Sequence, residues 1–214
     1  MIASTALAGT ASAAVVVNGG FEDPVVGGSY QTFNAISTIG AAGWQVLQGS
    51  VDVVKTGLSW GTSKEGAQFL DLVGTGLAVN EARLQQTLTG LTANTQYQLT
   101  FWYRANAGDV LAPGDTYQAS IRVSSSNAPT DILTLTQTQA NTGAWYQHTY
   151  NFTPVGTSAN LTFVALTSGV NNNGGVFLDA VSVTPVPEAS EWAMMLAGLG
   201  VVGLIARKRR QNTR

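Results

Sequence analysis

The central part of the chain alternates apolar and polar side chains, and Gly, Asn and Pro interrupt this alternation every few residues. The segment 97–104 (YQLTFWYR) shows the pattern most clearly. Its odd-numbered positions are aromatic or aliphatic, whereas Gln98, Thr100, Trp102 and Arg104 fall on the opposite face. A period of two residues indicates a β-strand with one face buried.

Other segments of the same kind predict further strands. They are 14–18, 51–54, 68–73, 82–89, 117–123, 132–136, 145–153, 161–166 and 176–183. This region has no convincing helical period, and no unit of about 20–50 residues repeats. Roughly nine to eleven short strands separated by turn residues predict an all-β fold, a two-sheet antiparallel sandwich of the jelly-roll type.

The end of the chain follows a different pattern. Residues 192–206 carry no charge, and the next four residues are all basic. The stretch shows no amphipathic stripe, so a helix packed on the domain core is not favoured. As a single hydrophobic helix, these 15 residues would be about 22 Å long. A helix that crosses a bilayer core needs roughly 20 residues, or about 30 Å. The cations that follow would hold such a helix at the cytoplasmic face of a membrane.

The first residues, 1–14, are small and apolar and contain the Ala-x-Ala pattern Ala11-Ser12-Ala13. They resemble the second half of a secretory signal peptide. No Lys or Arg precedes Lys55, so the positively charged start of such a peptide is missing. A truncated signal peptide is favoured over a plain tail of small residues, because the opposite end of the chain also indicates export.

Composition narrows the class of protein. Charged residues make up 10% of the chain, compared with about 25% in an average soluble domain, which fits an exported β-rich protein. The absence of cysteine excludes disulfides and thiolate metal sites. Residues 15–184 contain five basic and ten acidic side chains, so we do not expect nucleic-acid binding.

The segment 186–210 (VPEASEWAMMLAGLGVVGLIARKRR) resembles the PEP-CTERM sorting signal of exopolysaccharide-producing Gram-negative bacteria. The matching positions are Val186, Pro187, Glu188, Trp192, Arg207, Lys208, Arg209 and Arg210. Ala189 stands where that signal has its second proline. The resemblance implies that an exosortase-type membrane protease recognises residues 185–214 and cleaves near Pro187. The helix would then tether the protein to the inner membrane until processing releases it to the cell surface or the extracellular matrix.

The body of the chain resembles the secreted β-sandwich proteins of the choice-of-anchor C group. The segments that carry this resemblance are VNGGFEDP (17–24), GWQVLQGSVDVV (43–54), GAQFLDLVGTG (66–76) and LQQTLTGLTANTQYQLTFWYRAN (84–106). Their order is also similar to that in jelly-roll carbohydrate-binding modules. The resemblance implies one galactose-binding-like jelly roll over residues 15–184.

The same resemblance implies a structural calcium ion that joins the first strand to the last, since calcium prefers oxygen ligands. Glu22 and Asp179 occupy the matching positions. Ala180 stands where many such modules have a second acid. The alternative is that the two carboxylates only accept hydrogen bonds from turn amides.

Sugar recognition needs an aromatic ring for the apolar face of a pyranose, with planar polar groups beside it. Trp102 is the strongest candidate, because the alternation places it with polar side chains of its own strand. The residues predicted to bind a ligand are Trp102, Arg104, Gln98, Gln118, Arg122 and Trp60. Gln118 and Arg122 join this face only if segments 97–104 and 117–123 pair. The alternative for Trp102 is a position beneath a loop.

Catalysis is not expected. His148 is the single histidine and takes an inward position in segment 145–153, and no Gly-x-Ser-x-Gly motif is present. Any two of the ten acids could still form the pair that glycoside hydrolysis requires, so a hydrolase is the third hypothesis. The first is an exported module that binds extracellular polysaccharide, and the second is a structural or adhesive biofilm-matrix protein without sugar binding.

Overall fold

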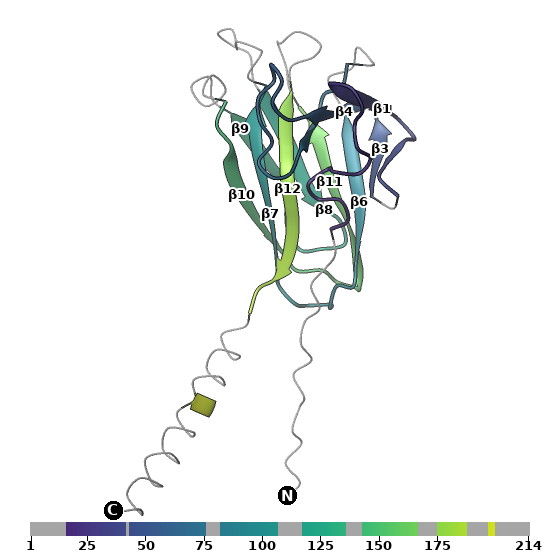
Figure 1. Cartoon of the computed structure of the whole chain (residues 1–214). Coiled ribbons are helices and arrows are strands. Elements are labelled where there is room, and N and C mark those ends of the chain that lie inside the picture. The colour runs from purple at the N-terminus through teal and green to yellow at the C-terminus, as the bar shows by residue number, and fades with distance from the viewer. Residues whose placement is uncertain are drawn as a thin grey trace, which may run out of the picture.

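The computed structural model describes residues 16–41, 43–75, 82–106, 117–135, 143–166, 175–187 and 197–199. Within these residues, twelve strands form two six-stranded antiparallel sheets that face each other (Figure 1). The first sheet has the order β1 (Tyr30–Asn34), β4 (Ser50–Lys55), β5 (Gln68–Asp71), β12 (Val176–Pro185), β7 (Tyr97–Ala105) and β10 (Tyr146–Phe152). The second sheet has the order β2 (Thr38–Ile39), β3 (Trp44–Gln48), β6 (Arg83–Thr89), β11 (Ser158–Ala165), β8 (Tyr117–Val123) and β9 (Asp131–Leu135).

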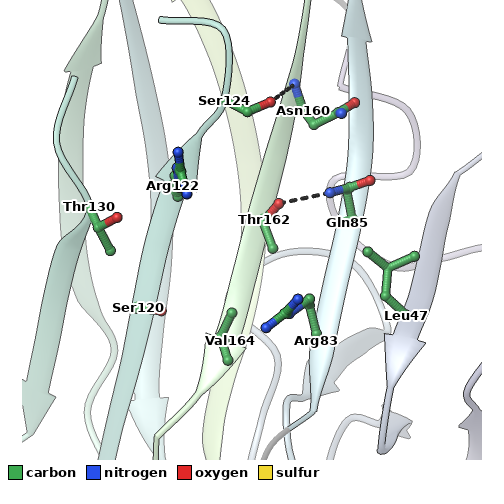
Figure 2. A pocket seen from close by; sticks show the side chains of 10 residues that line it. All are labelled: Leu47, Arg83, Gln85, Ser120, Arg122, Ser124, Thr130, Asn160, Thr162 and Val164. Atoms are coloured by element: carbon green, nitrogen blue, oxygen red, sulfur yellow. Dashed lines mark hydrogen bonds between the residues drawn. The ribbon is translucent and has the colours of Figure 1, made fainter. Parts of the chain in front are cut away.

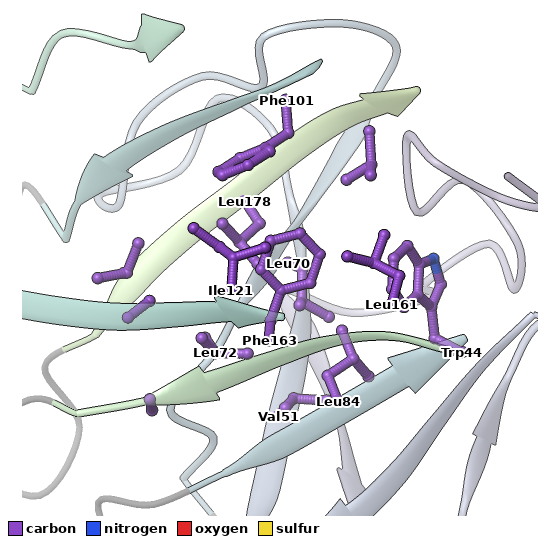
Figure 3. Packing of buried hydrophobic residues seen from close by; sticks show 14 of the residues in the cluster. Trp44, Val51, Leu70, Leu72, Leu84, Phe101, Ile121, Leu161, Phe163 and Leu178 are labelled. Carbon is purple, nitrogen blue, oxygen red and sulfur yellow. The ribbon is translucent and has the colours of Figure 1, made fainter. Parts of the chain in front are cut away.

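Inward side chains of both sheets form one hydrophobic core (Figure 3). Phe101 of β7 meets Phe163 of β11 edge to face, with ring centroids 5.1 Å apart. Trp44 of β3 lies 5.8 Å from Phe163 between ring centroids, and its indole Nε1 donates a hydrogen bond to the carbonyl of Asn18. Every second residue of each central strand therefore faces the opposite sheet, which is the burial that the alternation predicts.

The prediction of an all-β, two-sheet antiparallel sandwich is confirmed, and each predicted segment from 51–54 onward contains a strand. The predicted strand at 14–18 is wrong for its described residues, which enter a turn. The backbone of Val17 is paired with the side-chain amide of Gln86 instead of another strand. Strands β1, β2 and β3 were not predicted. In β1 the edge position leaves only Phe33 buried, so its alternation is weak.

The predicted C-terminal helix lies almost entirely outside the described residues. Residues 197–199 are described, and they are helical. Of the sorting-signal residues, Val186 and Pro187 are described, whereas Glu188, Trp192 and 207–210 lie outside. In the described ranges, no helix has the length and the apolar composition needed to cross a membrane.

Candidate functional site

The predicted ligand face is the outer surface of the first sheet. Trp102 and Gln98 of β7 point outward there and are half-buried. The ammonium group of Lys64 lies 3.6 Å from the centroid of the Trp102 ring. Lys64 therefore forms a cation–π contact with Trp102 and covers one face of its indole ring.

Arg104 does not face solvent as predicted but is buried beneath a loop. Its guanidinium carbon lies 5.1, 4.8 and 5.0 Å from the ring centroids of Phe69, Trp145 and Phe177. One terminal nitrogen donates to the carbonyl of Trp60 at 2.5 Å. Burial lowers the pKa of Arg104 to about 10, although the charges of Asp179 and Asp71 act in the opposite direction. Arg104 is therefore a buried cation and does not lie on the exposed surface where the sequence predicted it to bind a ligand.

The loop that covers Arg104 comprises residues 56–67, named here the cap loop. Trp60 of this loop is half-buried and packs edge to face on Tyr30, with ring centroids 5.6 Å apart. Trp145 donates from its indole Nε1 to the carbonyl of Thr62 at 2.9 Å. Gly61 has φ +100°, and a Cβ there would meet the Arg104 guanidinium at 2.5 Å, so a side chain at this position is not accommodated. The cap loop thus covers an aromatic cluster on the first sheet, and Trp60 belongs to that cover.

Glu22 and Asp179 both anchor the cap loop. Glu22 Oε1 accepts the amides of Ala67 and Gln68 at 2.8 and 2.9 Å. Asp179 Oδ2 accepts the amides of Lys64 and Glu65 at 2.7 and 3.1 Å, and its Oδ1 accepts the amide of Ala180. Burial raises the pKa of Asp179 to about 6, against the lowering effect of these amides.

These contacts bear on the implied calcium site. Three of the four carboxylate oxygens of Glu22 and Asp179 already accept amides, which is the alternative that the sequence left open. Across the described residues, no group of three or more His, Cys, Asp or Glu side chains is placed to hold a metal ion. No step of the function is therefore assigned to a calcium ion, and calcium binding stays a prediction.

Gln118 and Arg122 do not extend the Trp102 face, because β7 and β8 do not pair. Strand β8 lies in the second sheet, between β11 and β9. Gln118 donates from its side-chain amide to Thr134 Oγ1 of β9 at 2.9 Å. Arg122 points outward from the second sheet, on the opposite side of the molecule from Trp102.

The outer surface of the second sheet contains a groove of about 460 Å³ (Figure 2). It crosses β3, β6, β11 and β8. Most of the side chains that line it carry hydroxyl, amide or guanidinium groups. They are Leu47, Arg83, Gln85, Ser120, Arg122, Ser124, Thr130, Asn160, Thr162 and Val164. Arg122 is thus the one predicted ligand residue that the structure places in this groove.

Hydrogen bonds between neighbouring strands fix the floor of the groove (Figure 2). Gln85 of β6 donates from Nε2 to Thr162 Oγ1 of β11 at 3.0 Å. The backbone N–H of Asn160 donates to Ser124 Oγ at 3.2 Å, and Thr87 Oγ1 donates to Asn160 Oδ1 at 2.9 Å. These hydrogen bonds hold the floor groups in place before any ligand arrives, and Gln85, Asn160 and Thr162 all line the groove.

Sequence reasoning missed Arg83, Gln85, Asn160 and Thr162 as site residues. A signal existed for Arg83 and Gln85, because alternation in 82–89 places both on the outward side of the strand. Segment 161–166 gave no such signal for Thr162, because most of its residues are apolar, and Asn160 lies just before that segment. What was missing was the sheet order, which brings β6, β11 and β8 side by side.

The fold is a two-sheet antiparallel sandwich, and it is similar to the fold of the carbohydrate-binding module TmCBM61. Residues 14–184 match DUF642, a family described as proteins of unknown function, and the chain belongs to this family. Halomucin of Haloquadratum walsbyi is 32% identical over 190 residues. That match covers 86% of this chain but spans only 2% of the length of halomucin.

Solved structures similar to this chain include TmCBM61 in complex with β-1,4-galactotriose. Its TM-score is 0.50 at 15% identity, and the match covers 82% of this chain and 100% of that one. The CBM22-1 xylan-binding domain of Xyn10C from Paenibacillus barcinonensis has a TM-score of 0.44 at 16% identity, covering 74% and 95% of the two chains. At 15% identity the likeness to TmCBM61 concerns the fold alone.

Proposed function

We propose that this protein is a non-catalytic binder of extracellular polysaccharide and that the groove on the second sheet holds the glycan. The observation that carries the proposal is the lining of that groove, in which hydroxyl and amide groups are fixed across neighbouring strands. A glycan hydroxyl is both a donor and an acceptor, and side chains such as those of Gln85, Thr162 and Asn160 offer the complementary groups.

The choice of this surface over the first sheet follows from access. On the first sheet, the cap loop covers Arg104, and Lys64 lies over Trp102. On the second sheet, the described residues that line the groove include no aromatic side chain, carboxylate or histidine. Acid–base chemistry on a sugar requires carboxylates or similar groups, so the lining supports binding without catalysis.

Export is the second part of the proposal. The small-residue start and the PEP-CTERM-like segment support secretion, recognition by an exosortase-type protease and release to the surface or biofilm matrix. Expression with and without such a protease tests this part. We expect intact-mass analysis to find a species shortened near Pro187 only when the protease is present. Replacement of the four basic residues 207–210 by Gln should keep the full-length mass, and cleavage that ignores these residues would contradict the proposal.

Affinity electrophoresis through gels containing β-1,4-galactan, xylan, polygalacturonate or dextran sulfate tests sugar binding. We expect retardation of the wild type by at least one polymer. Thr162→Tyr should abolish it, because the added ring fills the centre of the groove from an outward position. Trp102→Ala, on the other sheet, should leave it unchanged. Loss of retardation in Trp102→Ala alone would place the site on the first sheet, and a folded wild type that no polymer retards would contradict sugar binding.

A structural or adhesive matrix protein is the second candidate, and one observation favours it. Ile36 is 96% exposed and Leu47 is 45% exposed, and both line a hollow of about 220 Å³ beside β2 and β3. Exposed apolar side chains that gather in this way favour contact with another protein or a second copy. Concentration-dependent sedimentation that Ile36→Ser abolishes, together with no glycan binding, would support this candidate.

A further inference from the structure

We infer that the groove on the second sheet selects acidic polysaccharides, because Arg83 and Arg122 supply two cations to a lining whose other described residues are uncharged. This inference rests on the proposed function and names the chemical class of its ligand. Both side chains are exposed and line the groove. In the described part of the chain, neither forms an ion pair with a carboxylate.

The sheet places the two arginines on either side of β11 (Figure 2). Arg83 of β6 is opposite Val164, and Arg122 of β8 is opposite Thr162. Two strand spacings and a two-residue offset separate their Cα atoms by about 12 Å. One polymer chain lying across β11 therefore meets both guanidinium groups, each through a separate anionic substituent.

In the described ranges, no carboxylate forms an ion pair with either arginine. Among the described acids, Asp131 is the nearest in register, since it lies opposite Ile121, the neighbour of Arg122. Asp131 Oδ2 is 2.9 Å from His148 Nε2, and its Oδ1 accepts the amide of Ile132. Both oxygens of Asp131 thus have partners other than Arg122, and the charged side chains among the described residues that line the groove are the two arginines.

The composition of the lining decides which interaction dominates affinity. Hydrogen bonds between neutral groups gain little, because a sugar hydroxyl exchanges water for protein. The apolar contributions from Leu47 and Val164 are small, and the described lining offers no aromatic platform. A guanidinium forms shorter, charge-assisted and often bidentate hydrogen bonds with carboxylate or sulfate. A neutral glycan therefore loses the strongest contacts that this groove can make.

The test uses matched polymers that differ only in charge. They are polygalacturonate with its methyl ester, and dextran sulfate with dextran, titrated against the full chain by calorimetry. We expect at least one acidic polymer to bind about tenfold or more tightly than its neutral partner. Arg83→Gln/Arg122→Gln should weaken that binding by about tenfold per arginine, with the neutral partner unaffected. Arg83→Lys/Arg122→Lys should recover part of the loss, since charge is kept and the planar fork is lost.

The control is Lys55→Gln/Lys64→Gln, which removes the same charge from the side of the first sheet. We expect this variant to bind acidic polymers as the wild type does. An equal loss in the control would show a non-specific effect of net charge and would overturn the inference. Equal affinity of the wild type for charged and neutral partners would overturn it too, while sugar binding in the groove would stand. A folded wild type that binds no polymer of either kind would overturn both proposals.

Discussion

His148 Nε2 lies 2.9 Å from Asp131 Oδ2, and this contact joins the two sheets at one edge of the sandwich. His148 belongs to β10, the last strand of the first sheet, and Asp131 begins β9, the last strand of the second. The His148 ring also packs 5.4 Å from the ring of Phe101, between centroids. The single histidine is therefore a link between the edge strands and lies outside the groove.

This link should contribute modestly to stability, because the side chains of His148 and Asp131 are 23% and 42% exposed. In a double-mutant cycle with His148→Gln and Asp131→Asn, we expect a coupling energy of about 1 kcal/mol or less, reduced further by salt. Urea unfolding near pH 6 measures it. A coupling of several kcal/mol would show that the sandwich edge depends on this pair far more than its exposure indicates.

Buried Asp179 should make the protein more stable as the pH falls from 7 to 4. Burial raises its pKa to about 6 in the folded state from 3.8, so between these values the folded protein binds more protons than the unfolded chain. Its effect on the free energy of unfolding reaches about 3 kcal/mol at most. Asp52 should also stabilise the folded protein as the pH falls, since burial raises its pKa too.

Thermal melts at pH 4–7 of the wild type and Asp179→Asn test this expectation. The difference between the two free energies of unfolding should change across that range in favour of the wild type at low pH. Asp52→Asn is the matched control and should leave the Asp179 contribution in place. A wild type that gains stability relative to Asp179→Asn as the pH rises would contradict the assignment.

Calcium binding at Glu22 and Asp179 stays a prediction. Melting temperatures measured with Ca²⁺ and with a chelator test it. A bound ion requires that Ca²⁺ raise the melting temperature, that chelator lower it, and that Glu22→Gln remove the difference. The amides already accepted by Glu22 Oε1 and by both Asp179 oxygens argue for the opposite result. An unchanged melting temperature under chelation would assign both carboxylates to the cap loop alone.

Arg104 should be far more important for stability than Arg122, although both are arginines on strands. Arg104→Met removes the hydrogen bond to the Trp60 carbonyl and the stacking on three aromatic rings. We expect a loss of about 2–4 kcal/mol in the free energy of unfolding. Arg122→Met, on the exposed groove, should change it by about 0.5 kcal/mol or less. Equal losses from the two variants would contradict the burial of Arg104.

The strands could be predicted from the sequence because alternation is a local property. In β7 it separates Leu99 and Phe101, which face the core, from Trp102, which points outward. The pairing of strands is not local. Strands β7 and β8 follow each other in sequence but lie in different sheets, so Arg122 is beside β11 and not beside Trp102.

Whether an outward side chain is exposed or buried also depends on distant segments of the chain. Arg104 has the alternation of an exposed residue, yet it is buried because the cap loop is held over it. That position of the loop depends on Glu22, 45 residues before Ala67, and on Asp179, 115 residues after Lys64. Alternation within one strand carries no information on such partners.

The cap loop leaves the sandwich with unequal outer faces. One is closed by aromatic packing, and the other is open and polar. Under the proposed function each molecule engages one polymer strand at a time, because its two sheets do not offer equivalent sites. A population of such molecules would decorate a polysaccharide without cross-linking it, and gel stiffening would require a second contact surface or self-association.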